Sequence, residues 1–509
     1  MRIQVLISLF ILNANLAVSQ VSLKEIDLEN GEYKVGFHHY LTSDSTRTYQ
    51  RQMDWNNKFI PRPIPVSIWY PSKRTISDLE PLTVLDYMEI LKEEEEWEYL
   101  PNEQILNWFY YPNTTSNRNH LDEKSTAFNG LETINGKFPV VVYAPSYQAS
   151  SIENFALCEY LASHGYVVIS SPSHGSENRW LAGGTAKDVE TQARDIEFLI
   201  SEVAKFPYAA FNNIATMGFS FGGLSNVLSQ IRNDNIKAIL SLDGSIKYQY
   251  TTLKTSPFFD IKKVDVPFIH MSQKDIPEQV LNEDKIDSGL NYKFEFYDNL
   301  VNSLAYQLKF NSLTHPYFST LGVLFQTRDI RQDNSNSEIM ESYKLVSLYT
   351  LNFLNAFLKN NANAIKFLNS EPSDNGIEKT LITWQYKQPT NSRFSFQDFN
   401  ELAAKQNYRD LKKLYESLIK QHPTMEIPEG DLNNLGLQLV FNPKTSEQGI
   451  NVFLLATTIY PGSANIFDSL AEGYLYIGNK DKAMINFQRS LELSPENQNA
   501  INRLKELKD

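Results

Sequence analysis

The sequence feature that most constrains the fold is the segment 218–223, which reads G-F-S-F-G-G and contains the pattern G-x-S-x-G. Residues 214–217 before it form a short apolar run typical of a buried strand, and residues 224–228 after it can begin a helix. A sharp turn between strand and helix strains its middle residue, so small neighbours are needed to avoid clashes. The pattern therefore predicts that the Ser220 hydroxyl projects above a sheet, next to a helix N-terminus.

Buried strands alternate with helices on both sides of this motif. Continuous apolar runs bounded by turn residues are typical of strands covered on both faces, which indicates a mainly parallel sheet between two layers of helices. The fold class expected for this part of the chain is therefore α/β. The expected strands are 138–143, 166–170, 214–217, 237–242, 266–271 and 306–310, and the expected helices are 152–163, 186–204 and 341–358.

The chain before residue 138 has a different pattern. Residues 31–70 contain alternating and apolar runs that predict antiparallel strands at a sheet edge. Residues 74–130 interrupt the strand pattern, and 79–99 within them look helical. An aromatic cluster at 108–112 follows. It could cap a site or serve local packing, and the sequence leaves both interpretations open.

After about residue 390 the period changes to that of paired helices. Phe453 and Phe487 are 34 residues apart, as are Pro461 and Pro495, and a weaker third copy precedes them. This period resembles the tetratricopeptide repeat, a helix-turn-helix unit that stacks on its neighbours. We expect an all-α repeat domain, whose role as a peptide-docking surface or as structural packing stays open.

Composition and the N-terminal sequence limit the expected partners and location of the protein. The net charge of −13, with no basic stripe, argues against a nucleic-acid partner. Residues 1–19 have the positive start, apolar stretch and small-residue cleavage site of a secretory signal, so we expect export to the periplasm or the medium after cleavage near Gln20. No other stretch predicts a transmembrane helix. The single cysteine, Cys158, lies in a helical pattern and is expected to be a core residue.

A serine hydroxyl is a poor nucleophile until a base takes its proton, and the base is normally a histidine oriented by a carboxylate. His315 follows the last expected strand and precedes a proline that stops the strand, so it is the favoured base. His270 lies inside an apolar strand, where a buried core histidine is the ordinary interpretation. Asp243, directly after the strand that follows the motif, is favoured as the acid over Asp275. A third downstream histidine, His422, belongs to the repeats.

An acyl-transfer site also needs hydrogen-bond donors for the developing oxyanion. Phe221 follows the serine, and its backbone N–H is one candidate. The second donor is expected from the loop after strand 138–143. Pro145 has no N–H, which leaves Ser146 or Tyr147.

Several segments together resemble a known family. Residues 161–168 read L-A-S-H-G-Y-V-V, residues 68–71 read I-W-Y-P, and Asp243 follows Ser220 by 23 residues. These features are similar to those of the platelet-activating factor acetylhydrolase family and the dienelactone-hydrolase-like esterases around it. The resemblance covers roughly residues 30–360.

The resemblance implies an α/β-hydrolase fold without a metal or organic cofactor. Carried over by position, it implies Ser220 as nucleophile, Asp243 as acid, His315 as base, and the backbone N–H groups of Tyr147 and Phe221 as the oxyanion hole. The chain departs from the family at residues 145–146, where the family tends to have His-Gly, and in its insertion and repeats. The phospholipid substrate is therefore not implied.

The expected protein is a secreted serine hydrolase that cleaves carboxylic esters of a small molecule or a lipid. Its expected parts are a signal peptide at 1–19, an α/β-hydrolase domain at 20–385 with an insertion at 74–130, and repeats at 390–509. Two alternatives stay open. One is a peptidase or amidase on the same scaffold, and the other is an inert hydrolase-like domain in a repeat-based binding protein.

Overall fold

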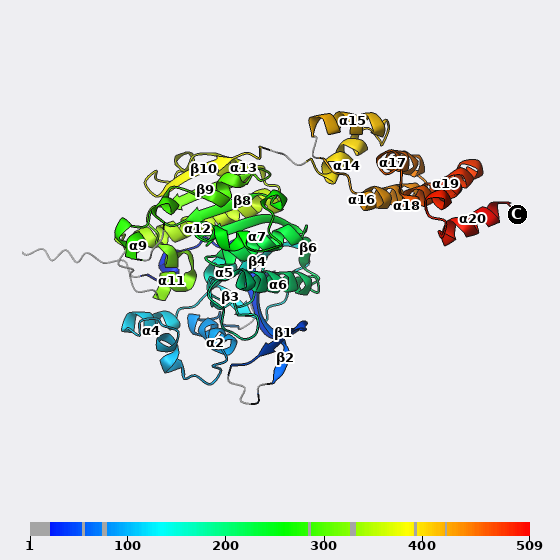
Figure 1. Cartoon of the computed structure of the whole chain (residues 1–509). Coiled ribbons are helices and arrows are strands. Elements are labelled where there is room, and N and C mark those ends of the chain that lie inside the picture. Colours follow the sequence, from blue (N-terminus) through cyan, green and yellow to red (C-terminus); the bar gives the residue numbers. More distant parts are fainter. Residues whose placement is uncertain are drawn as a thin grey trace, which may run out of the picture. The chain divides into compact units, whose positions relative to one another are not determined.

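The chain divides into two compact units, and its structure is a computed structural model (Figure 1). The first, here the α/β unit, is Met1–Thr390, and the second, the helical unit, is Asn391–Asp509. The expected signal peptide lies outside the described residues. The structure describes residues 21–52, 56, 58–73, 79–283, 287–325, 332–390, 394–422 and 425–508.

A ten-stranded sheet forms the centre of the α/β unit, in the order β10-β9-β8-β7-β6-β4-β5-β2-β1-β3. The six strands from β9 to β5 in this order are parallel, whereas β2 pairs antiparallel with β5 and β10 pairs antiparallel with β9. The strands are β1 (Lys34–Gln50), β2 (Phe59–Ser72), β3 (Ala127–Asn129), β4 (Phe138–Ala144), β5 (Val167–Ser170), β6 (Ala209–Phe219), β7 (Ile236–Leu242), β8 (Phe268–Ser272), β9 (Ala305–Phe310) and β10 (Ile382–Lys387).

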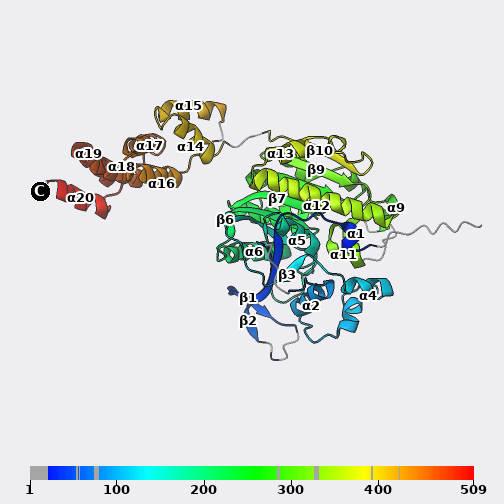
Figure 2. The ribbon, with the colours of Figure 1, turned by 180° about the vertical axis from the view of Figure 1, so that it is seen from behind.

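Helices cover both faces of this sheet. Figure 2 shows α12 across one face, and Figure 1 shows α6 and α7 on the other. The helices are α1 (Leu23–Ile26), α2 (Val84–Glu94), η1 (Asn102–Gln104), α3 (Ile105–Trp108), α4 (Thr115–Leu121), α5 (Phe155–Ser163), α6 (Ala186–Val203), α7 (Gly222–Arg232), α8 (Tyr250–Lys254), η2 (Ile261–Lys263), α9 (Glu278–Glu283), η3 (Ser288–Asn291), α10 (Glu295–Asn299), η4 (His315–Phe318), α11 (Thr320–Phe325), α12 (Asn336–Leu358), α13 (Ala362–Asn369) and η5 (Pro372–Asn375).

Strand β4 has a continuous apolar sequence because both of its faces are buried. Val141 and Tyr143 pack in the core layer that contains α5 and α12, whereas Val140 and Val142 pack in the layer that contains α6. Successive side chains of a strand point to opposite faces, so a strand buried on both sides needs apolar residues at every position. The α/β-hydrolase fold expected for this unit, a mostly parallel sheet between two helical layers, is confirmed.

The edges of the sheet and the insertion differ from expectation. The last strand is β10, which follows α12 and α13, whereas 306–310 was expected to be the final strand. Only Ile382 of β10 is buried and its other positions are half-buried or exposed, so its sequence is a weaker signal than a continuous apolar run. Helix α2 is shorter than the expected 79–99 because a capping box of Thr83 and Asp86 begins it.

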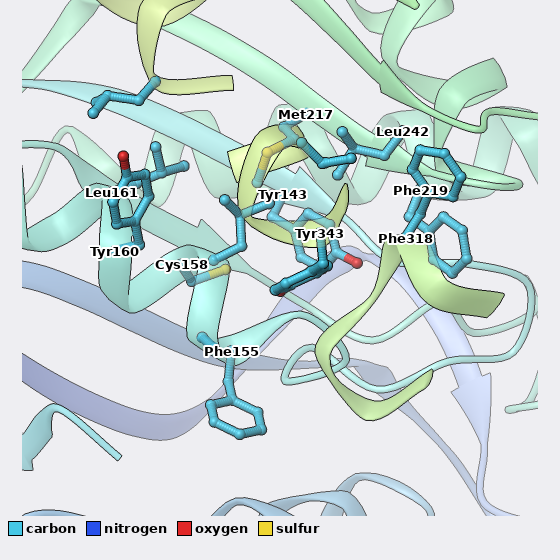
Figure 3. Close-up of a cluster of buried hydrophobic side chains, with 14 of the residues drawn as sticks. Tyr143, Phe155, Cys158, Tyr160, Leu161, Met217, Phe219, Leu242, Phe318 and Tyr343 are labelled. Atoms are coloured by element: carbon cyan, nitrogen blue, oxygen red, sulfur yellow. The ribbon is translucent and has the colours of Figure 1, made fainter. Parts of the chain in front are cut away.

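Cys158 lies in the core beneath the sheet, as expected. Figure 3 shows its sulfur among buried side chains that include Tyr143, Phe155 and Tyr343. Burial raises the pKa of the thiol well above its usual range. A thiol held protonated in this way is a packing group and a poor nucleophile.

The helical unit consists of successive helical pairs followed by a last helix. Phe453 and Phe487, one period apart in the sequence, are both fully buried, and Gly436 lies directly against Phe453. Among all the helices that the structure describes, none combines the length and the hydropathy of a membrane span. The helices are α14 (Phe396–Lys405), α15 (Leu411–Gln421), α16 (Glu429–Val440), α17 (Ser446–Ile459), α18 (Ala464–Tyr476), α19 (Lys480–Leu493) and α20 (Gln498–Lys508).

Candidate active site

The serine of the G-x-S-x-G motif lies in a sharp turn between β6 and α7, here called the elbow (residues 218–222). Ser220 has φ of 51°, a left-handed conformation that is costly for a residue with a side chain. A Cβ added to Gly218 would overlap the backbone of Gly222, and one added to Gly222 would overlap the carbonyl of Ala144 at the end of β4. Both glycines are therefore required by backbone sterics.

The structure brings the three predicted triad residues together at one edge of the sheet. His315 Nε2 is 3.0 Å from Ser220 Oγ, and His315 Nδ1 is 2.5 Å from Asp243 Oδ2. His315 begins η4 just beyond the end of β9, and its ring packs against Phe219 with the centroids 5.0 Å apart. The imidazole is 37% exposed, so a small molecule can reach it, whereas Asp243 is fully buried.

Asp243 is held as a carboxylate by the groups around it. Burial alone would raise its pKa, but the hydrogen bond and charge of His315 and the N–H of Gln273 together hold the pKa below its usual value. Oδ1 accepts hydrogen bonds from Gln273 N, at 3.0 Å, and from Tyr248 Oη, at 3.2 Å. An ionised, buried carboxylate fixes the imidazole tautomer and stabilises the imidazolium that forms when the serine loses its proton.

Two glycines that the motif does not contain allow Asp243 to approach the elbow. A Cβ on Gly223 would lie 2.8 Å from Gly244 Cα, and a Cβ on Gly244 would overlap the Ser241 hydroxyl. The helix after the serine and the loop after β7 are therefore in backbone contact. The sequence signal was the additional glycine after the motif, but its partner Gly244 is visible only in the fold.

Gln273 was missed by the sequence analysis. Its backbone N–H donates to Asp243, and its side-chain Oε1 accepts a hydrogen bond from the backbone N–H of His315 at 3.0 Å. One residue thus joins the loops that carry the acid and the base. A glutamine after a strand is not in itself a signal of this role.

The alternative acid and bases lie elsewhere. Asp275 pairs with Lys309 Nζ at 3.0 Å and is not the partner of His315. His270 is fully buried, its Nδ1 lies 2.9 Å from Ser241 Oγ, and burial lowers its pKa to about 3, so it is a core histidine. His422 belongs to the helical unit and stacks on Phe394.

The loop after β4, here the β4 loop (residues 145–154), contains both candidates for the second oxyanion donor. Their hydrogen bonds distinguish them. The N–H of Ser146 donates to Glu153 Oε2 at 2.9 Å and is therefore occupied. Within the described parts of the chain, the backbone N–H groups of Tyr147 and Phe221 donate to no protein group. The Tyr147 and Phe221 rings touch, with their centroids 5.7 Å apart, so the two free N–H groups belong to neighbouring residues.

Two buried carboxylates hold the β4 loop in place. Glu153 also accepts hydrogen bonds from the Ser146 hydroxyl, at 2.5 Å, and from Tyr143 Oη, at 3.1 Å. Glu94, at the end of α2, accepts hydrogen bonds from both hydroxyls of Ser150 and Ser151 and from the N–H of Ser151. Burial raises the pKa of both carboxyls, that of Glu94 to about 7. Neither role was predicted from the sequence.

The arrangement has parts that nucleophilic acyl transfer requires: a hydroxyl bonded to an imidazole, an oriented carboxylate, and an unpaired N–H on the residue after the serine. Tyr147, whose ring contacts Phe221, carries a second N–H that is unpaired within the described chain. Among the described residues, no group of three or more His, Cys, Asp or Glu side chains could hold a metal ion.

No protein-family model matches the chain. No curated protein matches it either. Among solved structures, a ferulic acid esterase from Streptomyces cinnamoneus is similar, with 16% identity and a TM-score of 0.47 over 70% of this chain and 98% of that one. The fold assignment therefore rests on the strand order and helical layers of the chain itself.

Proposed function

We propose that the chain is a serine hydrolase that cleaves carboxylic esters. The observation that carries this proposal is the continuous hydrogen-bonded series from Ser220 Oγ through the His315 ring to Asp243 Oδ2, with the serine in a strained elbow. Such a series is the arrangement that activates a serine hydroxyl.

In the proposed reaction Ser220 Oγ attacks the ester carbonyl while His315 Nε2 takes its proton. The carbonyl oxygen becomes an oxyanion that accepts hydrogen bonds from the N–H groups of Tyr147 and Phe221. His315 then gives the proton to the leaving alcohol, which leaves an acyl group on Ser220. Water, deprotonated by the same imidazole, attacks this acyl-enzyme and releases the acid.

Three finer assignments belong to the same proposal. The α/β unit is placed with the platelet-activating factor acetylhydrolase-like esterases on the motifs at Ser220 and Asp243 and on residues 161–168. The helical unit is proposed to be a tetratricopeptide-like array, supported by the buried Phe453 and Phe487 one period apart. Export is proposed from residues 1–19 alone.

The test is Ser220→Ala, which leaves the fold intact and removes the nucleophile. We expect hydrolysis of 4-nitrophenyl acetate to fall by about 10³-fold or more, and labelling by a fluorophosphonate probe to disappear. Ser201→Ala, at an exposed serine on α6, is the matched control and should retain both. Turnover that survives in Ser220→Ala would defeat the proposal.

The same assay separates the alternatives. A wild-type protein that resists the fluorophosphonate is an inert hydrolase-like domain, because only an activated serine reacts. A protein that labels but prefers aminoacyl amides over esters is a peptidase or amidase. The triad serves both reactions, so only the substrate panel distinguishes them.

A further inference from the structure

A cavity of about 720 Å³ lies in the α/β unit between the insertion and the β4 loop. This volume is within the range of small-molecule sites, about 300–1,000 Å³. The insertion contributes the wall formed by residues around α2 and α3, and the β4 loop contributes the opposite wall. Its lining includes the aromatic residues Trp97, Trp108, Tyr110 and Trp180, together with Ala149 and Arg179.

The cavity shares this wall with the candidate active site. Gln148 lines the cavity and directly follows Tyr147, whose ring touches Phe221. Glu153, which holds the Ser146 N–H, lines it as well, and its carboxylate is close enough to His315 for the imidazolium charge to affect its pKa. The cavity and the candidate active site are therefore joined through the β4 loop, which contributes Gln148 and Glu153 to the cavity lining and Tyr147 to the candidate site.

Aromatic side chains dominate the lining and are left uncovered. Trp108, Trp180 and Tyr110 are 44%, 51% and 96% exposed. Trp97 packs edge-on against Trp108, with the centroids 4.5 Å apart, so these two rings support each other. Aromatic rings prefer offset-stacked or edge-on contact with another ring. Contiguous exposed apolar patches mark interaction sites or ligand-binding grooves.

The charges of the lining disfavour an anionic ligand. Glu95 and Glu153 are the carboxylates, and Arg179 already pairs with Glu95 at 3.1 Å while its guanidinium lies 4.2 Å from the Trp180 ring. The described lining therefore has no free cation for a phosphate or carboxylate. Arg179 Nε is itself buried, so the accessible lining is mainly apolar and aromatic.

We propose that this cavity binds an uncharged aromatic group of the ester substrate and makes the enzyme selective for aryl-bearing esters. The inference rests on the proposed ester hydrolysis and deepens it by naming the substrate class. The aromatic group belongs to the acyl part or to the alcohol part of the ester, and the two arms of the test distinguish these.

The test compares kcat/KM for two aryl esters with kcat/KM for a reference ester that has no ring. Ethyl acetate is the reference, ethyl 3-phenylpropanoate carries the ring on the acyl side, and 2-phenylethyl acetate carries it on the alcohol side. In Trp108→Ala we expect the ratio of one aryl ester to ethyl acetate to fall by about 10–100-fold, the range that a lost apolar pocket contact costs. Ala149→Phe, which fills the cavity from the β4 loop, should lower the same ratio.

Tyr99→Ala is the matched control, because Tyr99 is an exposed aromatic residue of the same insertion that does not line the cavity. Its ratio should stay within about twofold of the wild type. Ratios that stay at the wild-type level in both Trp108→Ala and Ala149→Phe would overturn the inference.

A binding measurement separates failure of the inference from failure of the proposed function. Ethyl 3-phenylpropanoate and 2-phenylethyl acetate are titrated into Ser220→Ala, and the tryptophan emission is followed. Saturable quenching in Ser220→Ala that is lost when Trp108→Ala is added would support binding of the aromatic group in the cavity, even if the wild type hydrolysed no ester. Unchanged emission with both esters, together with normal hydrolysis of ethyl acetate by the wild type, would refute aromatic binding in the cavity. The proposed ester hydrolysis would stand.

Discussion

The elbow and the β4 loop each carry one proposed oxyanion donor, the N–H groups of Phe221 and Tyr147, and the two segments are held in different ways. The elbow is held by its backbone, because Gly218 packs on Gly222 and Gly222 packs on Ala144 at the end of β4, with no room for a Cβ on either. The β4 loop begins with Pro145 and is held by side chains, through hydrogen bonds to Glu153 and Glu94. One proposed oxyanion donor therefore depends on backbone sterics and the other on buried carboxylates.

The difference teaches where each half of the site is encoded. Backbone sterics act between neighbours in the chain, so the elbow appears as a short motif. The β4 loop depends on Glu153, within the loop itself, and on Glu94 of the insertion, which lies 57 residues before its partner Ser151. Three substitutions test this contrast, in order of decreasing effect.

The largest effect is expected from Gly222→Ala. The added methyl overlaps the carbonyl of Ala144, a backbone atom that cannot move without displacing β4. We expect kcat for 4-nitrophenyl acetate to fall by about 100-fold or more, and the free energy of unfolding to fall by about 2–4 kcal/mol. Gly430→Ala, at a glycine of α16 with open space around it, should show neither loss. Near-normal activity in Gly222→Ala would mean that the elbow is not held by its backbone.

A smaller effect is expected from Glu153→Leu, which removes the acceptors for Ser146 and Tyr143. The β4 loop then loses its support, and we expect kcat to fall by about 10–100-fold with less change in KM, because the oxyanion donor acts mainly in the transition state. Glu153→Gln keeps an acceptor for the Ser146 N–H but removes the negative charge. Its kcat should stay within about threefold of the wild type if loop support is what matters. Equal losses in both variants would instead assign the effect to the charge near His315.

The smallest effect concerns Glu94 and the pH dependence of stability. Its pKa of about 7 in the folded protein lies above the ordinary value of 4.5, so the folded state binds the proton more tightly than the unfolded state. The stability contributed by this group is complete below about pH 4.5 and is lost as the pH rises through 7. The side chain introduced by Glu94→Gln cannot titrate. The free energy of unfolding of the wild type minus that of Glu94→Gln should therefore fall by about 1–3 kcal/mol between pH 4.5 and 8.

Denaturant unfolding of both proteins at several pH values measures this difference. The control is Glu103→Gln in η1, which replaces an exposed carboxyl of the same insertion. The difference between this control and the wild type should not vary with pH, because an exposed carboxyl meets a similar environment in the folded and unfolded states. A constant difference for Glu94→Gln as well would contradict the assignment of a raised pKa to this carboxyl.

Much of the fold was predictable because its signals are local. The inner strands β4 to β8 are mostly buried and apolar, and the helices between them have an amphipathic period, so their order along the chain identified the sheet. Strand β10 and the true start of α2 were not predicted, because a mostly exposed edge strand and a capping box are weak signals. The candidate triad was placed by strand ends, and the fold brings those three residues together.

The sequence by itself determined the elbow, since steric exclusion around Ser220 acts over a few neighbouring residues, and it determined the sheet that carries it. Only the tertiary structure decided how the acid, the base and the β4 loop are joined. Gln273 connects two loops, Gly244 contacts Gly223, and Glu94 reaches the β4 loop from the insertion. Such contacts join residues that are distant in the chain, and hydrogen bonds between them leave no periodic or spaced pattern in a single sequence.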